Sequence, residues 1–299
     1  MQPIPTIDAH HHIWRLKDLT WLSGPQVPRI FGPYESIRRD YTIEEFRADT
    51  AGCSVVKSVY VQTNWPSEQS YDEARWLQSV ADATGWPHAN VAYADLADPD
   101  CATLIERLAQ LPATRGIRQQ IHWHVNPQYR FAPHPEVMND PQWRRGLAYL
   151  AEHNLLFEIQ LFTSQMHHGA ALARTFPDVV FVLEHAGMLE DMSGTGWKLW
   201  RDGMQALAAE PNMNVKLSGL GTFVRACRAG GVPGDDHGAL CRVDRHNSGR
   251  RLSDRRDGTA GAEARGGGRD SCLADEAHAL PGLCAGTYYE RCGESTAGR

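Results

Sequence analysis

The chain lacks long apolar runs and an excess of basic residues. Its apolar runs are no longer than segments such as Val179–Leu183, which suits a buried strand and is far too short to span a membrane. Acidic residues outnumber basic ones by 36 to 30, and the resulting net charge of −6 disfavours nucleic-acid binding. No basic segment followed by an apolar stretch opens the sequence, so we expect no secretory signal and a cytoplasmic protein. Homo-oligomerisation is left open.

The composition of the chain changes near Cys227. Residues 227–299 contain no Lys, Ile, Phe, Met, Trp or Gln, yet they hold 14 of the 27 glycines and 11 arginines. Such a segment has little to bury, and its glycines make ordering costly. We therefore expect a folded domain over residues 1–226 and a Gly/Arg/Ala-rich tail over 227–299 that is not a folded domain.

Three explanations of this tail remain open. Out-of-frame translation of a GC-rich gene is the one we favour, because it yields Arg, Gly, Ala and Ser and depletes Lys, Ile and Phe. A natural disordered tail is the second. A small zinc or disulfide module is the third, but the five cysteines of the tail show no Cys-x-x-Cys spacing.

The first 226 residues alternate between strand and helix patterns. Strands are predicted at about Thr6–His10, Val55–Gln62, Asn90–Ala94, Gly116–His122, Leu156–Leu161, Val179–Glu184 and Asn214–Leu217. Helices are predicted at about Ile43–Thr50, Tyr71–Ala83, Pro99–Leu111, Pro141–His153, Gln165–Phe176 and Lys198–Ala209, with Thr42 and Ser70 as caps and both prolines in first turns. Repeated units of this kind predict a parallel sheet. Seven strands predict a (β/α)8 TIM barrel that lacks strand eight and the last helix. No Gly-rich loop follows the first strand, which weakens a nucleotide-binding alternative.

The active sites of such barrels lie at the carboxyl ends of the strands. Along the first strand, alternation puts Asp8, His10 and His12 on one face and His11 on the other. Two imidazoles at i and i+2 converge on one point, as a divalent cation requires. We predict a metal site there.

Polar side chains also share the inner faces of the fourth and fifth predicted strands. On the fourth, Arg118, His122 and His124 lie together with Gln120, which suits an anionic or carbonyl-bearing substrate or, alternatively, a structural network. A second metal at His122 and His124 is left open. On the fifth, Glu158 and Gln160 share a face, and the buried carboxylate needs a metal or a basic partner.

The sixth and seventh strands add one histidine and one lysine. His185 follows the sixth strand just before a Gly turn, a suitable place for a metal ligand or proton carrier, although alternation groups it with Phe181 and Leu183. Lys216 is one of four lysines in the chain. Inside a barrel it must be paired, either with a substrate oxygen or with Glu158.

Four motifs follow one another in order over about residues 5–226: Asp8-Ala9-His10-His11-His12-Ile13-Trp14, Gly116-Ile117-Arg118, Leu183-Glu184-His185-Ala186-Gly187 and Val215-Lys216-Leu217-Ser218-Gly219-Leu220. Together they resemble amidohydrolase family 2, the metal-dependent TIM-barrel hydrolases. The segment Ile121-His122-Trp123-His124-Val125-Asn126-Pro127 is similar to the sugar-lactonase and dicarboxylate-lactonase members of that family. The resemblance implies His10, His12 and His185 as ligands of a divalent metal, zinc by expectation, although some members work without one. His185, which ends the sixth strand just before a Gly turn, is also the catalytic candidate. The candidate substrate contacts are Arg118, His122, His124, Gln160 and Lys216.

The resemblance also implies the chemistry. Metal-activated water attacks a lactone or related ester carbonyl, and an aspartate after strand eight, in a Gly-Ser-Asp type of turn, takes the proton. The sequence has no such turn, and Asp235 and Asp236 follow no apolar strand. We therefore expect this chain to be poorly stable, with exposed edges on the first and seventh strands, and nearly inactive. A decarboxylase on the same barrel and a non-catalytic remnant are the alternatives.

Overall fold

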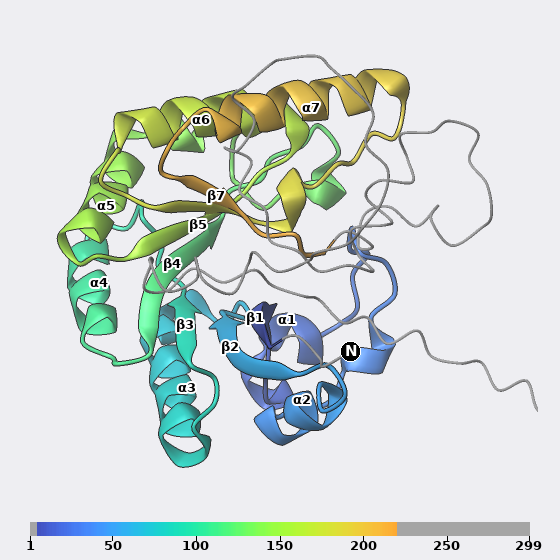
Figure 1. Ribbon diagram of the computed structural model, residues 1–299, viewed down its shortest axis with the longest axis vertical. Helices are drawn as coiled ribbons and strands as arrows, with labels where there is room; N and C mark the ends of the chain where they lie inside the picture. The colour runs from blue at the N-terminus through green and yellow to red at the C-terminus, as the bar shows by residue number, and fades with distance from the viewer. Residues whose placement is uncertain (1–4, 220–299) are drawn as a thin grey trace, which may run out of the picture.

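A single curved sheet organises the computed structural model, which describes residues 5–219 (Figure 1). All neighbouring strands are parallel and follow chain order. The strands are β1 (Thr6–His11), β2 (Val55–Val61), β3 (Ala89–Ala92), β4 (Thr114–Gln120), β5 (Leu156–Gln160), β6 (Phe181–Leu183) and β7 (Met213–Val215). Within the described range, β1 and β7 each pair on one side only. This arrangement confirms the incomplete (β/α)8 barrel, while the expectations for the tail 227–299 lie outside the described residues.

Helices cover the outer face of the sheet, as Figure 1 shows for α3 to α7. The α-helices are α1 (Thr20–Ser23), α2 (Ile43–Asp49), α3 (Ser70–Thr84), α4 (Cys101–Ala109), α5 (Pro141–Glu152), α6 (Met166–Thr175) and α7 (Gly194–Ala208). Short 3-10 turns occupy Leu16–Asp18, Glu35–Ile37, Ser67–Gln69, Pro127–Tyr129, Val137–Asn139, Thr163–Gln165 and His185–Gly187.

The predicted helix starts are correct where a side chain caps the helix. Thr42 accepts a hydrogen bond from the Glu45 amide at the start of α2. At the start of α5, Asp140 accepts two amide hydrogen bonds and Pro141 occupies the first turn. The other two predictions are wrong, since Ser70 is the first residue of α3 and α4 begins two residues after Pro99.

Strand alternation on β5 separates an apolar outer face from an inner face that carries a buried charge. On β5, Phe157 and Ile159 point outward into the main core, which fills the space between the sheet and helices α4 to α7. Between them, Glu158 points inward and is 1% exposed. Aliphatic residues, among them Ala9 and Val59, line the cavity inside the curve of the sheet together with Glu158 and Lys216. Ala9 lines this cavity because the register of β1 against β2 shifts between Asp8 and His11, so strict alternation does not hold there.

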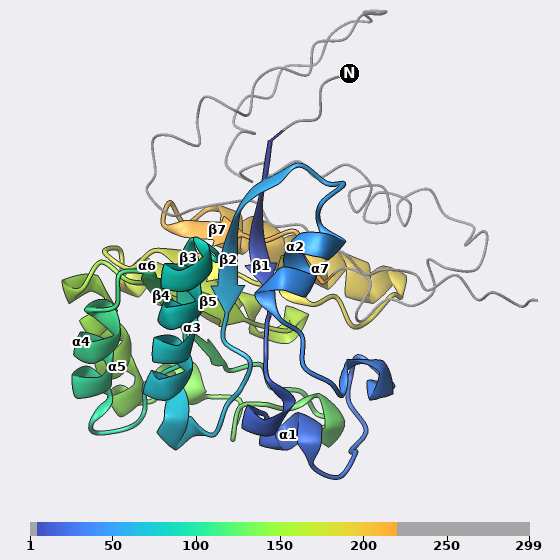
Figure 2. The same ribbon diagram turned by 90° about the horizontal axis from the view of Figure 1, so that it is seen from below.

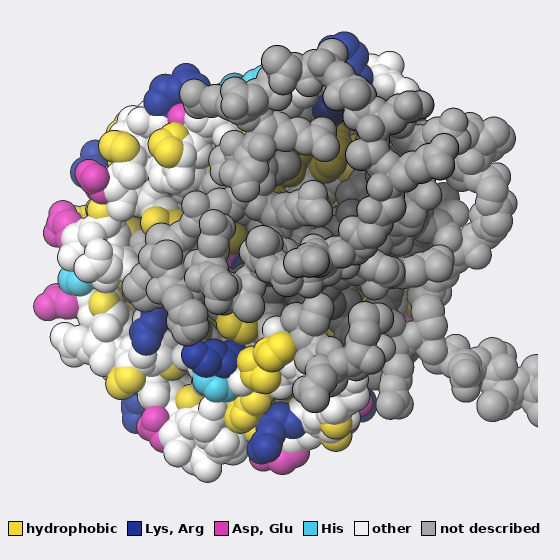
Figure 3. All heavy atoms as spheres, in the orientation of Figure 1, with side chains coloured by type: hydrophobic (Ala, Val, Ile, Leu, Met, Phe, Trp, Pro, Cys, Tyr) yellow, Lys and Arg dark blue, Asp and Glu magenta, His cyan; other side chains and the backbone are white. Residues whose placement is uncertain are grey.

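The strands run in one direction, as Figure 2 shows for β1 and β2, so their carboxyl ends gather at one end of the molecule. Figure 3 shows positive and negative side chains interspersed on the visible outer rim, the ordinary pattern of a solvated surface. Among residues 5–219, no helix is long and apolar enough to cross a membrane.

Candidate metal centre and active site

His10 and His12 converge at the end of β1, as the alternation predicts. Their Nε2 atoms lie 3.3 Å apart. His11 points to the opposite side, where its ring stacks on that of Phe46 in α2 with centroids 4.0 Å apart. The strand geometry thus separates two inward imidazoles from one that belongs to the outer packing.

The surroundings of His12 decide its tautomer. Its Nδ1 lies 2.7 Å from the Val61 carbonyl oxygen, which can only accept a hydrogen bond, so Nδ1 carries the hydrogen and Nε2 carries the lone pair. Burial lowers the pKa of His12 to about 3, and the nearby charge of Arg118 acts in the same direction. His12 is therefore neutral near pH 7, with Nε2 available to a cation or a donor.

His185 reaches the same point by a different backbone route. Its predicted grouping with Phe181 and Leu183 is wrong. Strand β6 ends at Leu183, Glu184 is still extended, and both His185 and Ala186 then adopt left-handed φ values, 54° and 50°. This turn brings the His185 ring inward, with its centroid 4.9 Å from that of His10. Its Nδ1 lies 3.0 Å from the Ser218 hydroxyl oxygen.

Glycine at position 219 permits this placement of His185. A Cβ at Gly219 would lie 2.6 Å from His185 Nδ1, closer than real Cβ contacts occur, and the φ of 61° there also favours glycine. The close approach of the Gly219 backbone to the His185 ring thus depends on the absence of a side chain at position 219.

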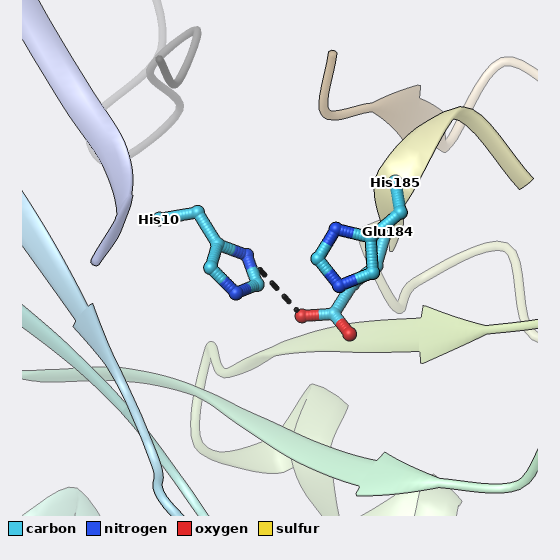
Figure 4. A group of neighbouring side chains, drawn as sticks. All are labelled: His10, Glu184 and His185. Atoms are coloured by element: carbon cyan, nitrogen blue, oxygen red, sulfur yellow. Dashed lines mark ion pairs between the residues drawn. The ribbon is translucent and has the colours of Figure 1, made fainter. Parts of the chain in front are cut away.

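Sequence reasoning missed Glu184 as a site residue. Its carboxylate is fully buried, 0% exposed, and together with His10 and His185 it forms the group of potential metal ligands found within residues 5–219, all ligand atoms lying within 4.8 Å of one another (Figure 4). Oε1 of Glu184 lies 3.5 Å from His10 Nδ1, and Oε2 lies 2.9 Å from Arg118 Nε. The signal was present: alternation from inward Val182 puts the next inward side chain at Glu184.

A second buried ion pair lies inside the curve of the sheet. Lys216 Nζ donates to Glu158 Oε1. Of the two partners predicted for this lysine, a substrate oxygen or Glu158, the structure has Glu158. Burial raises the pKa of Glu158 to about 7, against the opposing effect of Lys216, and the neighbouring Glu184 raises it further. Asp8 is also buried, which raises its pKa to about 6 although it accepts a hydrogen bond from the His10 amide.

The chain's sequence relationships agree with this geometry. A family model described as amidohydrolase matches residues 7–262. The chain belongs to the amidohydrolase family. The match ends beyond the change in composition near Cys227, so the expectation that the similarity stops at about residue 226 is not met by the family model.

Three relatives illustrate what this amidohydrolase is similar to. It is 39% identical over 223 residues to the uncharacterized protein y4mH of Sinorhizobium fredii, covering 74% of this chain and 75% of that protein. It is 29% identical over 216 residues to an L-fucono-1,5-lactonase of Burkholderia ambifaria, covering 72% and 68% respectively. Among solved structures, an amidohydrolase of Burkholderia multivorans with bound zinc superposes with a TM-score of 0.61 at 25% identity, over 77% of this chain and 75% of that one. Family membership makes the chain a hydrolase by relationship.

The remaining predicted site residues lie on or just after the neighbouring strands β4 and β5, and we refer to them as the polar wall. Arg118 donates to Gln160 Oε1 at 3.1 Å, and Gln120 donates to the same oxygen at 3.2 Å. His122 and His124 both pack against the ring of Phe162, with centroids 5.4 Å and 5.3 Å away. Aromatic contacts therefore surround these two histidines, and the described residues include no three-ligand group that contains them.

Proposed function

We propose that this amidohydrolase is a metal-dependent hydrolase that opens a lactone or related cyclic ester. The observation that carries the proposal is the convergence of the His10, His12 and His185 rings beside the Glu184 carboxylate at the carboxyl ends of the strands. The similarity to an L-fucono-1,5-lactonase supports a sugar lactone as the substrate.

The histidine pair fits a divalent cation in its spacing. Two nitrogens bound to zinc at 2.0–2.1 Å and at the tetrahedral angle lie about 3.3–3.4 Å apart. The Nε2 atoms of His10 and His12 are 3.3 Å apart. The zinc-bound relative of similar fold points to the same ion.

The hydrogen count at His10 supports the same conclusion. A neutral His10 has one N–H, yet Nε2 faces the lone pair on His12 Nε2 and Nδ1 faces the Glu184 carboxylate. Burial holds the pKa of His10 well below its usual range, so a second proton on the ring is disfavoured. A cation between the two Nε2 atoms would leave the single N–H at Nδ1, directed at Glu184. Without a hydrogen on Nδ1, His10 Nδ1 and Glu184 Oε1 are both buried and have no hydrogen-bond partner.

We assign His10, His12 and His185 as the metal ligands. Glu184 is the alternative third ligand, but its Oε2 is paired with Arg118 and its Oε1 lies beside His10 Nδ1, positions suited to orienting His10. A bound divalent ion would supply polarisation of the ester carbonyl and a lowered pKa for attacking water.

The polar wall is suited to binding the lactone. Gln160 and the Arg118 guanidinium lie side by side on the inner face and would hydrogen-bond substrate oxygens. His122 and His124 would contact the ring from the side of Phe162. Lys216 is hydrogen-bonded to Glu158, so it would act on the substrate through its positive charge. It would contact the substrate directly only if the substrate displaced the Glu158 carboxylate. His185 would serve as a ligand and, through its position, limit access to the carbonyl.

This chain differs from its family in the residue that would accept the proton from the attacking water. The aspartate turn that the resemblance implies after strand eight has no counterpart in the sequence. Loss of a positioned proton carrier lowers turnover by roughly two to four orders of magnitude. We therefore expect metal binding with very slow ring opening.

Metal binding and turnover of the purified full chain test this proposal. After chelation and addition of zinc, we expect about one ion per chain and ring opening of L-fucono-1,5-lactone far slower than by the relative named for it. His12→Ala should abolish tight metal binding, whereas Glu184→Gln should weaken it without abolishing it. His168→Ala, which removes an exposed imidazole from α6, is the matched control.

Three outcomes would overturn the proposal. A folded wild-type chain that binds no metal and opens no lactone would be a non-catalytic remnant. Carbon dioxide released from an aromatic carboxylate, with lactones unchanged, would indicate a decarboxylase. Equal metal loss in the His12→Ala and His168→Ala variants would show that the assigned imidazoles are not ligands.

A further inference from the structure

A buried carboxylate outside the site makes three hydrogen bonds through one oxygen. Glu73 lies on the first turn of α3 and is 2% exposed. Its Oε1 accepts from the Tyr60 hydroxyl at 2.6 Å, the Thr63 amide at 2.7 Å and the Thr63 hydroxyl at 3.0 Å. Burial raises the pKa of Glu73, with these bonds acting in the opposite direction.

The segment that Glu73 holds carries two carbonyls that face the metal centre. The Val61 carbonyl accepts from His12 Nδ1 at 2.7 Å, and the Gln62 carbonyl accepts from Arg118 Nη1 at 3.2 Å. Thr63 follows them directly in the chain. The Glu73 carboxylate is therefore linked through two peptide units to the orientation of one proposed ligand and of the guanidinium that pairs with Glu184.

Three other hydrogen bonds also hold this segment, and one of them runs from the Gln62 amide to the Val91 carbonyl of β3 at 2.9 Å. The indole of Trp21 donates to the Thr63 carbonyl at 2.9 Å, and the Asn64 amide donates to the Gln62 side chain at 2.6 Å. Asn64 has a left-handed φ of 60°, so the backbone leaves the extended conformation just after Thr63. Removing the acceptor would leave the Thr63 amide buried without a partner, whereas the Tyr60 and Thr63 hydroxyls would keep only each other, at 3.2 Å. The segment would relax to satisfy the amide.

We propose that Glu73 is a positioning residue for the metal centre: by anchoring Thr63 it holds the Val61 and Gln62 carbonyls that orient His12 and Arg118. This inference rests on the proposed function, because His12 is a ligand only if the site binds metal. A merely structural role would instead make Glu73 a contributor to folding stability with no specific effect on His12.

The test compares substitutions of Glu73 with those of a second buried glutamate. Glu210 is 6% exposed and pairs with Arg174, away from the β2 segment. We expect Glu73→Ala to weaken zinc affinity by about 10- to 100-fold, the usual effect of losing an outer partner of a metal ligand. Glu73→Gln, which keeps an oxygen acceptor, should recover most of this loss. Glu210→Ala should lower the melting temperature without changing zinc affinity.

A measurement on metal-free protein separates this inference from the proposed function. Nitrogen NMR of the ring of His12 should report the Nδ1–H tautomer in the wild type and a mixture of tautomers in Glu73→Ala. If Glu73→Ala does not fold, Glu73→Asp, which shortens the reach by one methylene, should show the same change. An unchanged tautomer and affinity in a folded Glu73 variant would overturn the inference. Failure of wild type to bind zinc, with the tautomer change intact, would overturn only the proposed function.

Discussion

Replacing His11 with Phe should make the protein less sensitive to acid. His11 is 5% exposed, stacks on Phe46, and has neither ring nitrogen hydrogen-bonded. Burial, the largest cause, lowers the pKa of His11 from 6.5 to about 3. Below pH 6.5 the unfolded chain therefore binds a proton at this position that the folded chain does not, so stability is lost as pH falls from 6.5 toward 3.

The size of the effect follows from the shift. One pH unit below an unfolded-state pKa of 6.5, a single such histidine costs about 1.4 kcal/mol of folding free energy, and near pH 7.5 it costs almost nothing. His12, His122 and His185 have pKa values lowered to about 3 in the same way, so the wild type should lose several times this amount between pH 7.5 and 5.5. His11→Phe should lose about 1.4 kcal/mol less.

Urea unfolding of chelator-treated protein at pH 7.5 and pH 5.5 measures this difference. The comparison is the change with pH within each variant, so any pH-independent packing effect of the larger Phe ring cancels. Replacing His168, which is exposed on α6, by Phe is the control and should leave the pH dependence as in the wild type. Equal pH dependence for His11→Phe and wild type would refute the reasoning, since His11 would then be protonated in the folded state or already buried in the unfolded one.

Three other substitutions test contacts of the structure. Lys216→Met leaves the buried Glu158 carboxylate unpaired and should lower the free energy of unfolding by about 3–5 kcal/mol in urea titrations, with recovery in a Lys216→Met, Glu158→Leu double variant. Gly219→Ala forces a Cβ against His185 Nδ1 and should reduce zinc affinity by calorimetry; unchanged affinity would count against this close approach. Asp140→Ala removes the cap of α5 and should lower the free energy of unfolding by about 1 kcal/mol in the same urea titrations.

The strands were predictable where a short run carries apolar side chains on its outer face. The residues of β5 illustrate this: Phe157 and Ile159 pack outward and Glu158 points inward, as a period of two requires. Boundaries were less accurate where no capping side chain marks them. The start of α4 was misplaced because Pro99 can occupy several loop positions, whereas the Asp140 side chain caps α5 directly.

The sequence by itself determined the inward pairing of His10 and His12, because alternation is a local property of extended backbone. Tertiary structure decided the partners of the buried charges. Lys216 meets Glu158 across 58 residues of sequence, and Glu184 reaches both His10 and Arg118, only because the sheet curves and brings distant strands to one interior. It also decided the place of His185, where two left-handed residues end the alternation and turn the ring inward. Local periodicity specifies which side of a strand a residue occupies, while burial in a shared, weakly solvated interior determines which charges must pair.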